Sequence, residues 1–220
     1  MRRTAIISDI HSNFPALTAV FAVIDNEGAD RILCAGDLVG YNSMPNEVIE
    51  LLRKRGVISI AGNHDIGAVT RDYSRMNALA SKALQLNLSM ITESNLSYLR
   101  SLKRSEFLDD IAIYHGSPSD TDEYIFEDMV DERLASQSGK HITVLGHTHI
   151  PYIRSVGSYV VVNPGSVGQP RDGDARASFL LLSGDRADIR RVPYDIEEIA
   201  ERNSAAGIPL PLSERLRWGV

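Results

Sequence analysis

Five short apolar segments of this chain are each followed at once by a block of Asp, Asn, His and Gly residues. The segments are typical of buried strands in their length and apolar content. The polar blocks are Asp9-Ile10-His11, Gly36-Asp37, Gly62-Asn63-His64-Asp65, His115-Gly116 and Gly146-His147-Thr148-His149. Ligands of open α/β sheets gather just outside the carboxyl ends of the strands. We therefore expect the five blocks to meet at one edge of a sheet.

Strand and helix patterns alternate in the first part of the chain. They predict strands over 4–8, 31–35 and 57–61, with helices over 16–26 and 45–55 between them. Alternation at this spacing is typical of a parallel sheet with right-handed crossovers.

Residues 66–104 interrupt this alternation. Helical periodicity over 74–91 and 95–102 predicts a helical excursion packed beside the sheet. Such helices usually pack into a core, but a lid is an alternative because they follow His64 directly.

The rest of the chain first resumes the strand pattern and then changes. Strands are expected over 111–114 and 142–145, on either side of a helix over 128–138, and helices over 196–206 and 213–217 close the chain. Beyond residue 151, short runs with hairpin-like breaks predict antiparallel strands. These strands are 152–155, 159–162, 178–182 and 187–193. Since no repeat or linker interrupts the pattern, we expect one domain over residues 1–220.

The composition argues against several classes of protein. A formal net charge of −6 disfavours a broad basic surface for nucleic acid, although a small anionic substrate can still bind at a local cationic site. The one cysteine, Cys34, excludes an internal disulfide and suits a reducing compartment. No segment approaches the roughly 20 apolar residues of a membrane-spanning helix, and Asp9 interrupts the first apolar run too early for a signal peptide. We expect a cytoplasmic protein with no membrane partner and no stable nucleic-acid partner.

The residue types in the blocks are those that bind transition metals. In an extended segment, residues i and i+2 point the same way, so Asp9 is expected to share a target with His11, and His147 with His149. Two carboxylates, one amide and four imidazoles suit a pair of divalent ions, with Mn favoured and Fe, Zn or Ni as alternatives. Two such ions about 3.5–4 Å apart can clamp an in-line displacement at phosphorus.

Taken singly, each histidine has a simpler interpretation as a capping or hydrogen-bonding residue at the end of a strand. Five blocks in the same structural position favour a shared site instead. His141 has no such block around it and is expected to be structural.

The blocks also resemble the sequence pattern of the calcineurin-like metallophosphoesterases. That pattern is D-x-H, GD, GNH with an acidic residue after it, a lone H, and GHxH, and all the parts occur here in this order between residues 9 and 149. The resemblance extends through Asn163-Pro164-Gly165-Ser166 to the C-terminal helix. It implies an α/β fold, a two-sheet β sandwich flanked by helices, with the helical excursion at about 66–104.

The resemblance implies a role for each residue of the blocks. One ion would be held by Asp9, His11, Asp37 and His149, and the other by Asp37, Asn63, His115 and His147, with Asp37 bridging. His64 would protonate the leaving group, with Asp65 orienting its imidazole. Imidazole titrates in the range that such a step needs.

The function implied is hydrolysis of phosphate esters, with phosphodiesters favoured, by attack of a metal-bridging hydroxide on a small phosphorylated substrate. One alternative is a catalytically silent protein of the same fold that serves as a scaffold for partner proteins. A nuclease of the same family is another. The filled ligand positions favour an enzyme, and the acidic balance disfavours a nuclease.

Two residues outside these ligand sets are candidates for binding substrate. Arg171 lies in the turn-rich segment 163–172, and its guanidinium suits phosphate oxygens, although a loop arginine is more often solvated surface. Asn13 lies just past the first block, where ordinary turn chemistry explains it nearly as well.

Overall fold

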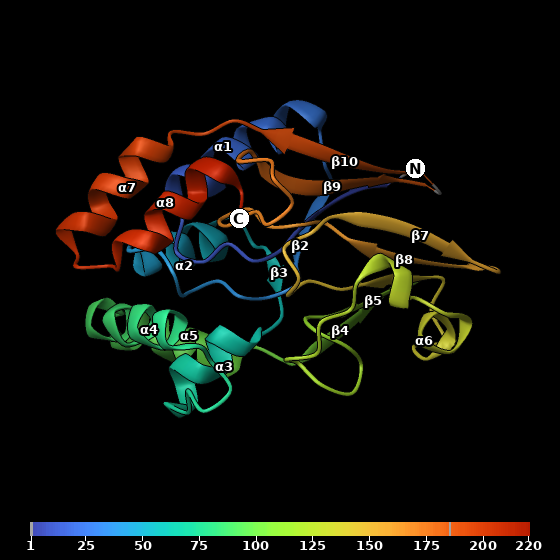
Figure 1. Ribbon diagram of the computed structural model, residues 1–220. Helices are drawn as coiled ribbons and strands as arrows, with labels where there is room; N and C mark the ends of the chain where they lie inside the picture. Colours follow the sequence, from blue (N-terminus) through green and yellow to red (C-terminus); the bar gives the residue numbers. More distant parts are fainter. Residues whose placement is uncertain (1, 185) are drawn as a thin grey trace.

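The chain folds into two five-stranded sheets that pack face to face, with helices outside them (Figure 1). This computed structural model describes residues 2–184 and 186–220. The predicted two-sheet sandwich flanked by helices is confirmed.

The first sheet combines parallel strands with an antiparallel hairpin. Its strands are β1 (Arg3–Ile7), β2 (Arg31–Cys34), β3 (Ile58–Ser59), β9 (Ala177–Ser183) and β10 (Arg186–Val192). They lie in the order β10-β9-β1-β2-β3. β1 pairs in parallel with β2 and β2 with β3, whereas β9 is antiparallel to both β1 and β10. Both the parallel start of the chain and the later hairpin agree with the sequence pattern.

The second sheet has the same mixed character. Its strands are β4 (Ser105–Leu108), β5 (Ile111–Tyr114), β6 (Ile142–Val144), β7 (Tyr152–Val156) and β8 (Tyr159–Asn163), in the order β4-β5-β6-β8-β7. β5, β6 and β8 run parallel, and β4 and β7 are antiparallel edge strands. The sequence pattern does not predict β4, because this short, half-polar strand forms only by pairing with β5 across the tight turn at Asp109.

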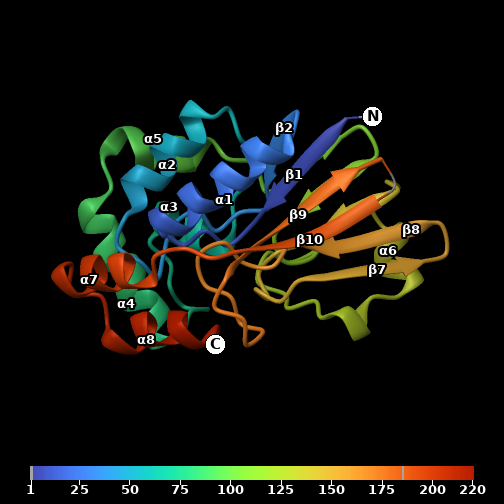
Figure 2. The ribbon, with the colours of Figure 1, turned by 90° about the horizontal axis from the view of Figure 1, so that it is seen from above.

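Helices cover the outer faces of both sheets. They are α1 (Phe14–Glu27), α2 (Pro45–Lys54), α3 (Asn63–Thr70), α4 (Ala78–Met90), α5 (Glu93–Ser101), α6 (Glu132–Ser136), α7 (Ile196–Ala205) and α8 (Leu210–Trp218). α1 packs on the first sheet, whereas α6 lies against β7 and β8 of the second (Figure 2). Among the described residues, no helix is long and apolar enough to cross a membrane.

Strand β1 shows how the core is built in layers. Its Ala5 and Ile7 side chains pack against the helices, whereas Ile6, between them, packs against the second sheet. Successive side chains of a strand point to opposite faces, so one apolar strand contributes to both layers. This explains why the strands before the polar blocks are apolar throughout.

Two expectations about the elements are wrong. The strands before the polar blocks do not share one sheet, because β1, β2 and β3 lie in the first and β5 and β6 in the second. The helix expected over 128–138 is limited to a 3-10 turn at Glu127–Met129 and the short α6. Helix α3 begins at Asn63, within the third block.

Candidate metal centre

The polar blocks turn sharply where the strands end. Asp9, His11, Asp37, His147 and His149 all have positive φ, between +48° and +64°. These residues are therefore not extended, and the i, i+2 argument for their pairing is wrong. Asp and His tolerate this left-handed conformation better than most residues do. This conformation still costs free energy, and residues that adopt it are common at functional sites, where the backbone sets the direction of a side chain.

Backbone hydrogen bonds and close contacts join the first three blocks. The amides of Asp9 and Ile10 donate to the carbonyls of Gly36 and Asp37, at 3.0 and 2.9 Å. A Cβ atom at Gly36, which has φ +98°, would lie 2.6 Å from the amide nitrogen of Gly62. Only glycine lets these two blocks approach so closely.

The side chains of the blocks converge in a buried cluster. Nε2 of His115 lies 3.2 Å from Oδ2 of Asp37 and 3.9 Å from Oδ1 of Asp9. Nε2 of His149 lies 3.4 Å from Oδ1 of Asp9 and 3.1 Å from Nε2 of His11. All five side chains are at most 2% exposed.

The cluster contains three groups of potential ligand atoms, and within each group these atoms lie within 4.8 Å of one another. The first group is Asp9, His11 and His149, and the second is Asp37, His115 and His147. The third, His11, Asp37 and His64, shares one residue with each of the others. Oδ1 of Asn63 joins the second group, 3.1 Å from Nε2 of His115. Oδ2 of Asp37 also lies 3.6 Å from Nε2 of His11, between the groups. His147 and His149 thus fall in different groups, the division that the resemblance implies.

Hydrogen bonds to backbone carbonyls fix the histidine tautomers. Nδ1 of His11, His115 and His149 lies 3.0, 2.8 and 2.6 Å from the carbonyl oxygens of Val39, Ala35 and Gln169, respectively. A carbonyl only accepts, so each Nδ1 carries the proton and each Nε2 presents a lone pair to the cluster. In His147 the roles are reversed, because Nε2 lies 3.2 Å from the carbonyl oxygen of Asp122 and Nδ1 is left for the cluster. This is the arrangement that orients histidines toward a metal.

Within the described part of the chain, two carboxylate oxygens of the cluster are buried without any hydrogen-bond partner, Oδ1 of Asp9 and Oδ2 of Asp37. The other oxygens are occupied, since Oδ2 of Asp9 accepts from the amide of His147 and Oδ1 of Asp37 from the amide of His64. A buried, unpaired carboxylate oxygen is unfavourable unless a cation lies beside it. These oxygens, surrounded by imidazole lone pairs, fit divalent transition metals.

The pKa values of His115, Asp37 and His147 reflect this arrangement. Burial opposes protonation of His115, but the nearby carboxylates of Asp37 and Asp9 outweigh it and raise the pKa of His115 to about 10. Burial would raise the pKa of Asp37, but the charge of His115 above all holds it well below its usual range. Burial dominates at His147 and lowers its pKa to about 3. A histidine binds a metal through an unprotonated nitrogen, so a metal ion and a proton compete for the Nε2 lone pair of His115.

His64 and Asp65 do not interact as expected. The Asp65 carboxylate instead accepts from the backbone amides of Gly62, Leu38 and Val39, at 3.0, 3.0 and 3.2 Å. Asp65 is the third residue of α3, so its carboxylate lies at the helix N-terminus and ties the Asp37 block to it. The expectation that Asp65 orients the imidazole is therefore wrong.

The His64 ring is held by packing. Its centroid lies 4.8 Å from those of His11 and Tyr41. Nδ1 of His64 is buried without a partner, against Gly40, where any Cβ atom would overlap the ring. Burial, above all, lowers the pKa of His64 to about 4.

Arg171 lies beside the cluster, whereas Asn13 does not. A cavity of about 150 Å³ is lined by Arg171, Tyr41 and His64, among others. Arg171 donates to the hydroxyl of Tyr41 and to Oε1 of Gln169, both at 3.1 Å. Asn13 is fully buried, caps α1 and donates to a backbone carbonyl. Its expected role in binding substrate is wrong, because its side chain is fully buried and lines neither of the cavities near the cluster.

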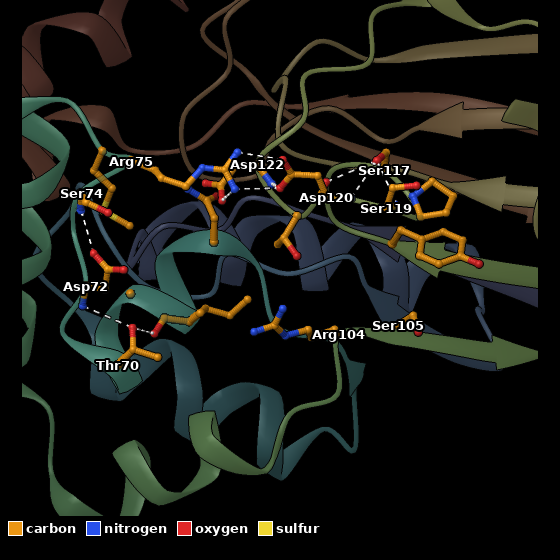
Figure 3. Close-up of a pocket in the computed structure, with 17 residues that line it drawn as sticks. Thr70, Asp72, Ser74, Arg75, Arg104, Ser105, Ser117, Ser119, Asp120 and Asp122 are labelled. Atoms are coloured by element: carbon orange, nitrogen blue, oxygen red, sulfur yellow. Dashed lines mark hydrogen bonds and ion pairs between the residues drawn. The ribbon is translucent and has the colours of Figure 1, made fainter.

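A second cavity, of about 450 Å³, adjoins the first (Figure 3). The two share the lining residues Asn63, Arg75, Met76 and Asp122. Its walls come from α3, the loop before α4, and the loop after β5. A ligand bound at the cluster can therefore extend into it past Asn63.

The fully buried Asn87 ties α4 to the cluster. Its Oδ1 accepts from the hydroxyl of Ser12 at 2.6 Å and from the amide of Gly40 at 2.8 Å. Its Nδ2 donates to the carbonyls of Asn42 and Ala83, at 2.7 and 3.2 Å. All the bonding capacity of the amide is used, so α4 is fixed to two of the loops that carry cluster residues. These contacts favour a packed helix over a lid at α4.

Three residues that support the site, Asn87, Asp122 and Tyr124, lie outside the sequence predictions. Asp122 binds His147 through its carbonyl, and the Tyr124 ring lies 4.1 Å, between centroids, from that of His147. For Asn87 a signal exists: it follows Ala80 and Ala83, both buried, at helical spacing. For Asp122 and Tyr124 the local sequence has no feature that predicts which loop reaches His147.

Comparison with known proteins extends the resemblance beyond the blocks. The family described as the calcineurin-like phosphoesterase superfamily domain matches residues 2–186. An uncharacterised protein of Methanocaldococcus jannaschii is 36% identical, over 98% of this chain and 97% of its own. Phosphodiesterase YfcE of Escherichia coli is 26% identical, over 84% of this chain and 89% of its own.

A solved structure gives the same result for the fold. The metallophosphoesterase from Sphaerobacter thermophilus is 34% identical and superposes with a TM-score of 0.84. The match covers 100% of this chain and 99% of that one. The similarity therefore includes the helical excursion and the C-terminal helices.

The Asn87 contacts predict a specific defect in metal binding. We expect Asn87→Ala to lower Mn²⁺ affinity by up to about tenfold, the lower end of the effect of losing a direct partner of a ligand, because Asn87 acts on the loops that carry the ligands. The loss of its hydrogen bonds should also destabilise the fold by about 1–3 kcal/mol. Calorimetric titration with Mn²⁺ and urea unfolding measure the two effects.

Asn95→Ala is the matched control. Asn95 is buried in α5 and bonds to Asn46 and Glu50, away from the cluster. It should lose similar stability with no change in Mn²⁺ affinity. Equal Mn²⁺ affinities in the two variants would contradict the role of Asn87.

Proposed function

The chain belongs to the calcineurin-like phosphoesterase superfamily and is a metal-dependent phosphoric ester hydrolase, and we propose that it hydrolyses small phosphodiesters at a two-metal centre. The main support is the pair of buried, unpaired oxygens on Asp9 and Asp37, with imidazole lone pairs directed at them. Preference for a diester is supported by the similarity to the phosphodiesterase of Escherichia coli.

The two ligand groups would hold the ions. Asp9, His11 and His149 would bind one and Asn63, His115 and His147 the other, with Asp37 shared. Manganese is our choice, since carboxylates mixed with imidazoles suit it, as they do iron, zinc and nickel. Bound there, the ions would supply Lewis-acid charge to the phosphoryl oxygens and a nucleophilic hydroxide at neutral pH.

Arg171 would orient the phosphoryl group. Its Nη2 donates to two neutral partners, Tyr41 and Gln169, and among the described residues no carboxylate forms an ion pair with it. A guanidinium without a carboxylate partner retains its capacity for phosphate oxygens. Its charge would also stabilise the negative charge that spreads over those oxygens during displacement.

His64 would protonate the leaving oxygen. Its Nδ1 is buried against Gly40, so Nε2 is the nitrogen available to a ligand. An arriving phosphate anion adds negative charge beside the ring and favours its protonated form. The proton can then pass from Nε2 to the leaving oxygen as the ester bond breaks.

The two cavities suit an ester with a sizeable organic group. The smaller, of about 150 Å³, matches a phosphoryl group at the cluster. The larger, of about 450 Å³, gives the organic group room.

Hydrolysis of bis(p-nitrophenyl) phosphate tests this function. Protein treated with a chelator should be inactive and should recover activity when Mn²⁺ is added. If no divalent metal restores turnover of this or any other phosphate ester, a protein-binding scaffold becomes the better interpretation.

The shared position of Asp37 predicts that one substitution disturbs both ions. We expect Asp37→Ala to bind fewer than two metal ions and to lose more than about 100-fold in hydrolysis, beyond the usual effect of changes behind a ligand. Elemental analysis and the chromogenic assay measure this. Asp110→Ala, which removes an exposed carboxylate, is the control. Two fully occupied sites in Asp37→Ala would exclude the bridging role.

The role of His64 predicts a dependence on the leaving group. His64→Ala should keep both metals and slow the release of an alkyl alcohol by about 10²–10⁴-fold, the contribution of a general acid. Release of p-nitrophenol, which needs little protonation, should change far less. Kinetics with methyl and p-nitrophenyl esters measure this, with the exposed His141→Ala as control. Unchanged turnover of the alkyl ester would remove His64 from the mechanism.

A further inference from the structure

Arg75, in the loop between α3 and α4, reaches across to the loop after β5 (Figure 3). Its Nη1 and Nη2 donate to the two carboxylate oxygens of Asp120, at 2.9 and 2.8 Å. Nη1 also lies 2.9 Å from Oδ2 of Asp122. We call these three residues the Arg75 clasp. Because one guanidinium binds two carboxylates, one of them bidentately, the clasp is a network rather than an isolated surface pair.

The clasp lies directly behind a proposed metal ligand. The carbonyl oxygen of Asp122 accepts from Nε2 of His147 at 3.2 Å, and the Tyr124 ring packs on the His147 ring. The loop that Arg75 holds therefore supports His147 through a hydrogen bond and through packing. That hydrogen bond leaves Nδ1 of His147 for the second ligand group.

His147 is supported differently from the other histidines of the cluster. The carbonyls that fix His11, His115 and His149 belong to Val39, Ala35 and Gln169, which are at most 1% exposed. The support of His147 comes from a loop whose clasp residues are solvent-accessible, with the Arg75 side chain 58% exposed. The carbonyls behind the first three histidines thus belong to buried residues, whereas the loop behind His147 is held by solvent-accessible side chains.

We propose that Arg75 is a positioning residue for His147. By binding Asp120 and Asp122, it holds the Asp122 carbonyl against Nε2, so that Nδ1 faces Asp37 and His115. The inference rests on the proposed function, since it concerns the ion held by Asp37, Asn63, His115 and His147. It predicts that losing Arg75 weakens that ion's site and leaves the site of Asp9, His11 and His149 intact.

The change in metal affinity expected from loss of positioning is opposite in sign to the change expected from charge alone. Removing a positive charge near a cation site, and freeing two carboxylates beside it, should by Coulomb attraction strengthen metal binding. Loss of positioning should weaken it. A decrease in affinity therefore points to geometry.

The test is calorimetric titration of metal-free protein with Mn²⁺, with the EPR signal of a spin-coupled manganese pair as second readout. In Arg75→Ala we expect one of the two Mn²⁺ affinities to fall by about tenfold or more, the other to be unchanged, and the coupled signal to need more Mn²⁺. Arg75→Lys keeps the charge but not the bidentate contact, and should lie between Arg75→Ala and the wild type.

Arg104→Ala is the matched control, because Arg104 lines the same larger cavity without taking part in the clasp. Its Mn²⁺ affinities should equal those of the wild type or rise slightly. Unchanged or tighter binding in Arg75→Ala, or equal weakening in Arg104→Ala, would overturn the role of Arg75. A wild type that binds a single Mn²⁺ ion would instead count against the two-metal centre itself.

Discussion

Two buried carboxylate oxygens, Oδ1 of Asp9 and Oδ2 of Asp37, constrain the structure around them. Neither has a hydrogen-bond donor among the described residues, and in the neutral rings the Nε2 atoms facing them carry lone pairs, because backbone carbonyls hold the opposite ring protons. Such a concentration of acceptors is unfavourable in a protein interior unless positive charge lies among them. The raised pKa of His115 reflects the same need for positive charge. A divalent metal ion would supply more positive charge than one proton does.

The fold assembles these acceptors by bringing strand ends together from two sheets. β1, β2 and β3 lead into the first three blocks, and β5 and β6 of the facing sheet lead into the other two. Left-handed residues and glycines at the strand ends let the blocks pack against one another. Asp65 and Asn87 then tie the resulting loops to α3 and α4. Much of the helical excursion thus supports the site.

The sequence predicts the parts of this site that depend on the order of residues within short segments. The apolar strands, the polar blocks after them and the separation of His147 from His149 are all visible in it, the last through the family resemblance. Contacts between distant segments are not. Asp65 binds backbone amides of another block, Asn13 donates to the carbonyl of Gly168 instead of facing a ligand, and Arg75 reaches a loop that begins beyond β5. These roles depend on how the loops approach in three dimensions, which residue order alone does not determine.

Anomalous diffraction from crystals grown with Mn²⁺ tests the central claim most directly. Data collected at the manganese absorption edge should give two peaks. One peak should lie among Asp9, His11 and His149, the other among Asn63, His115 and His147, and a carboxylate oxygen of Asp37 should contact both ions. A single peak, or ions bound without Asp37, would contradict the two-metal centre.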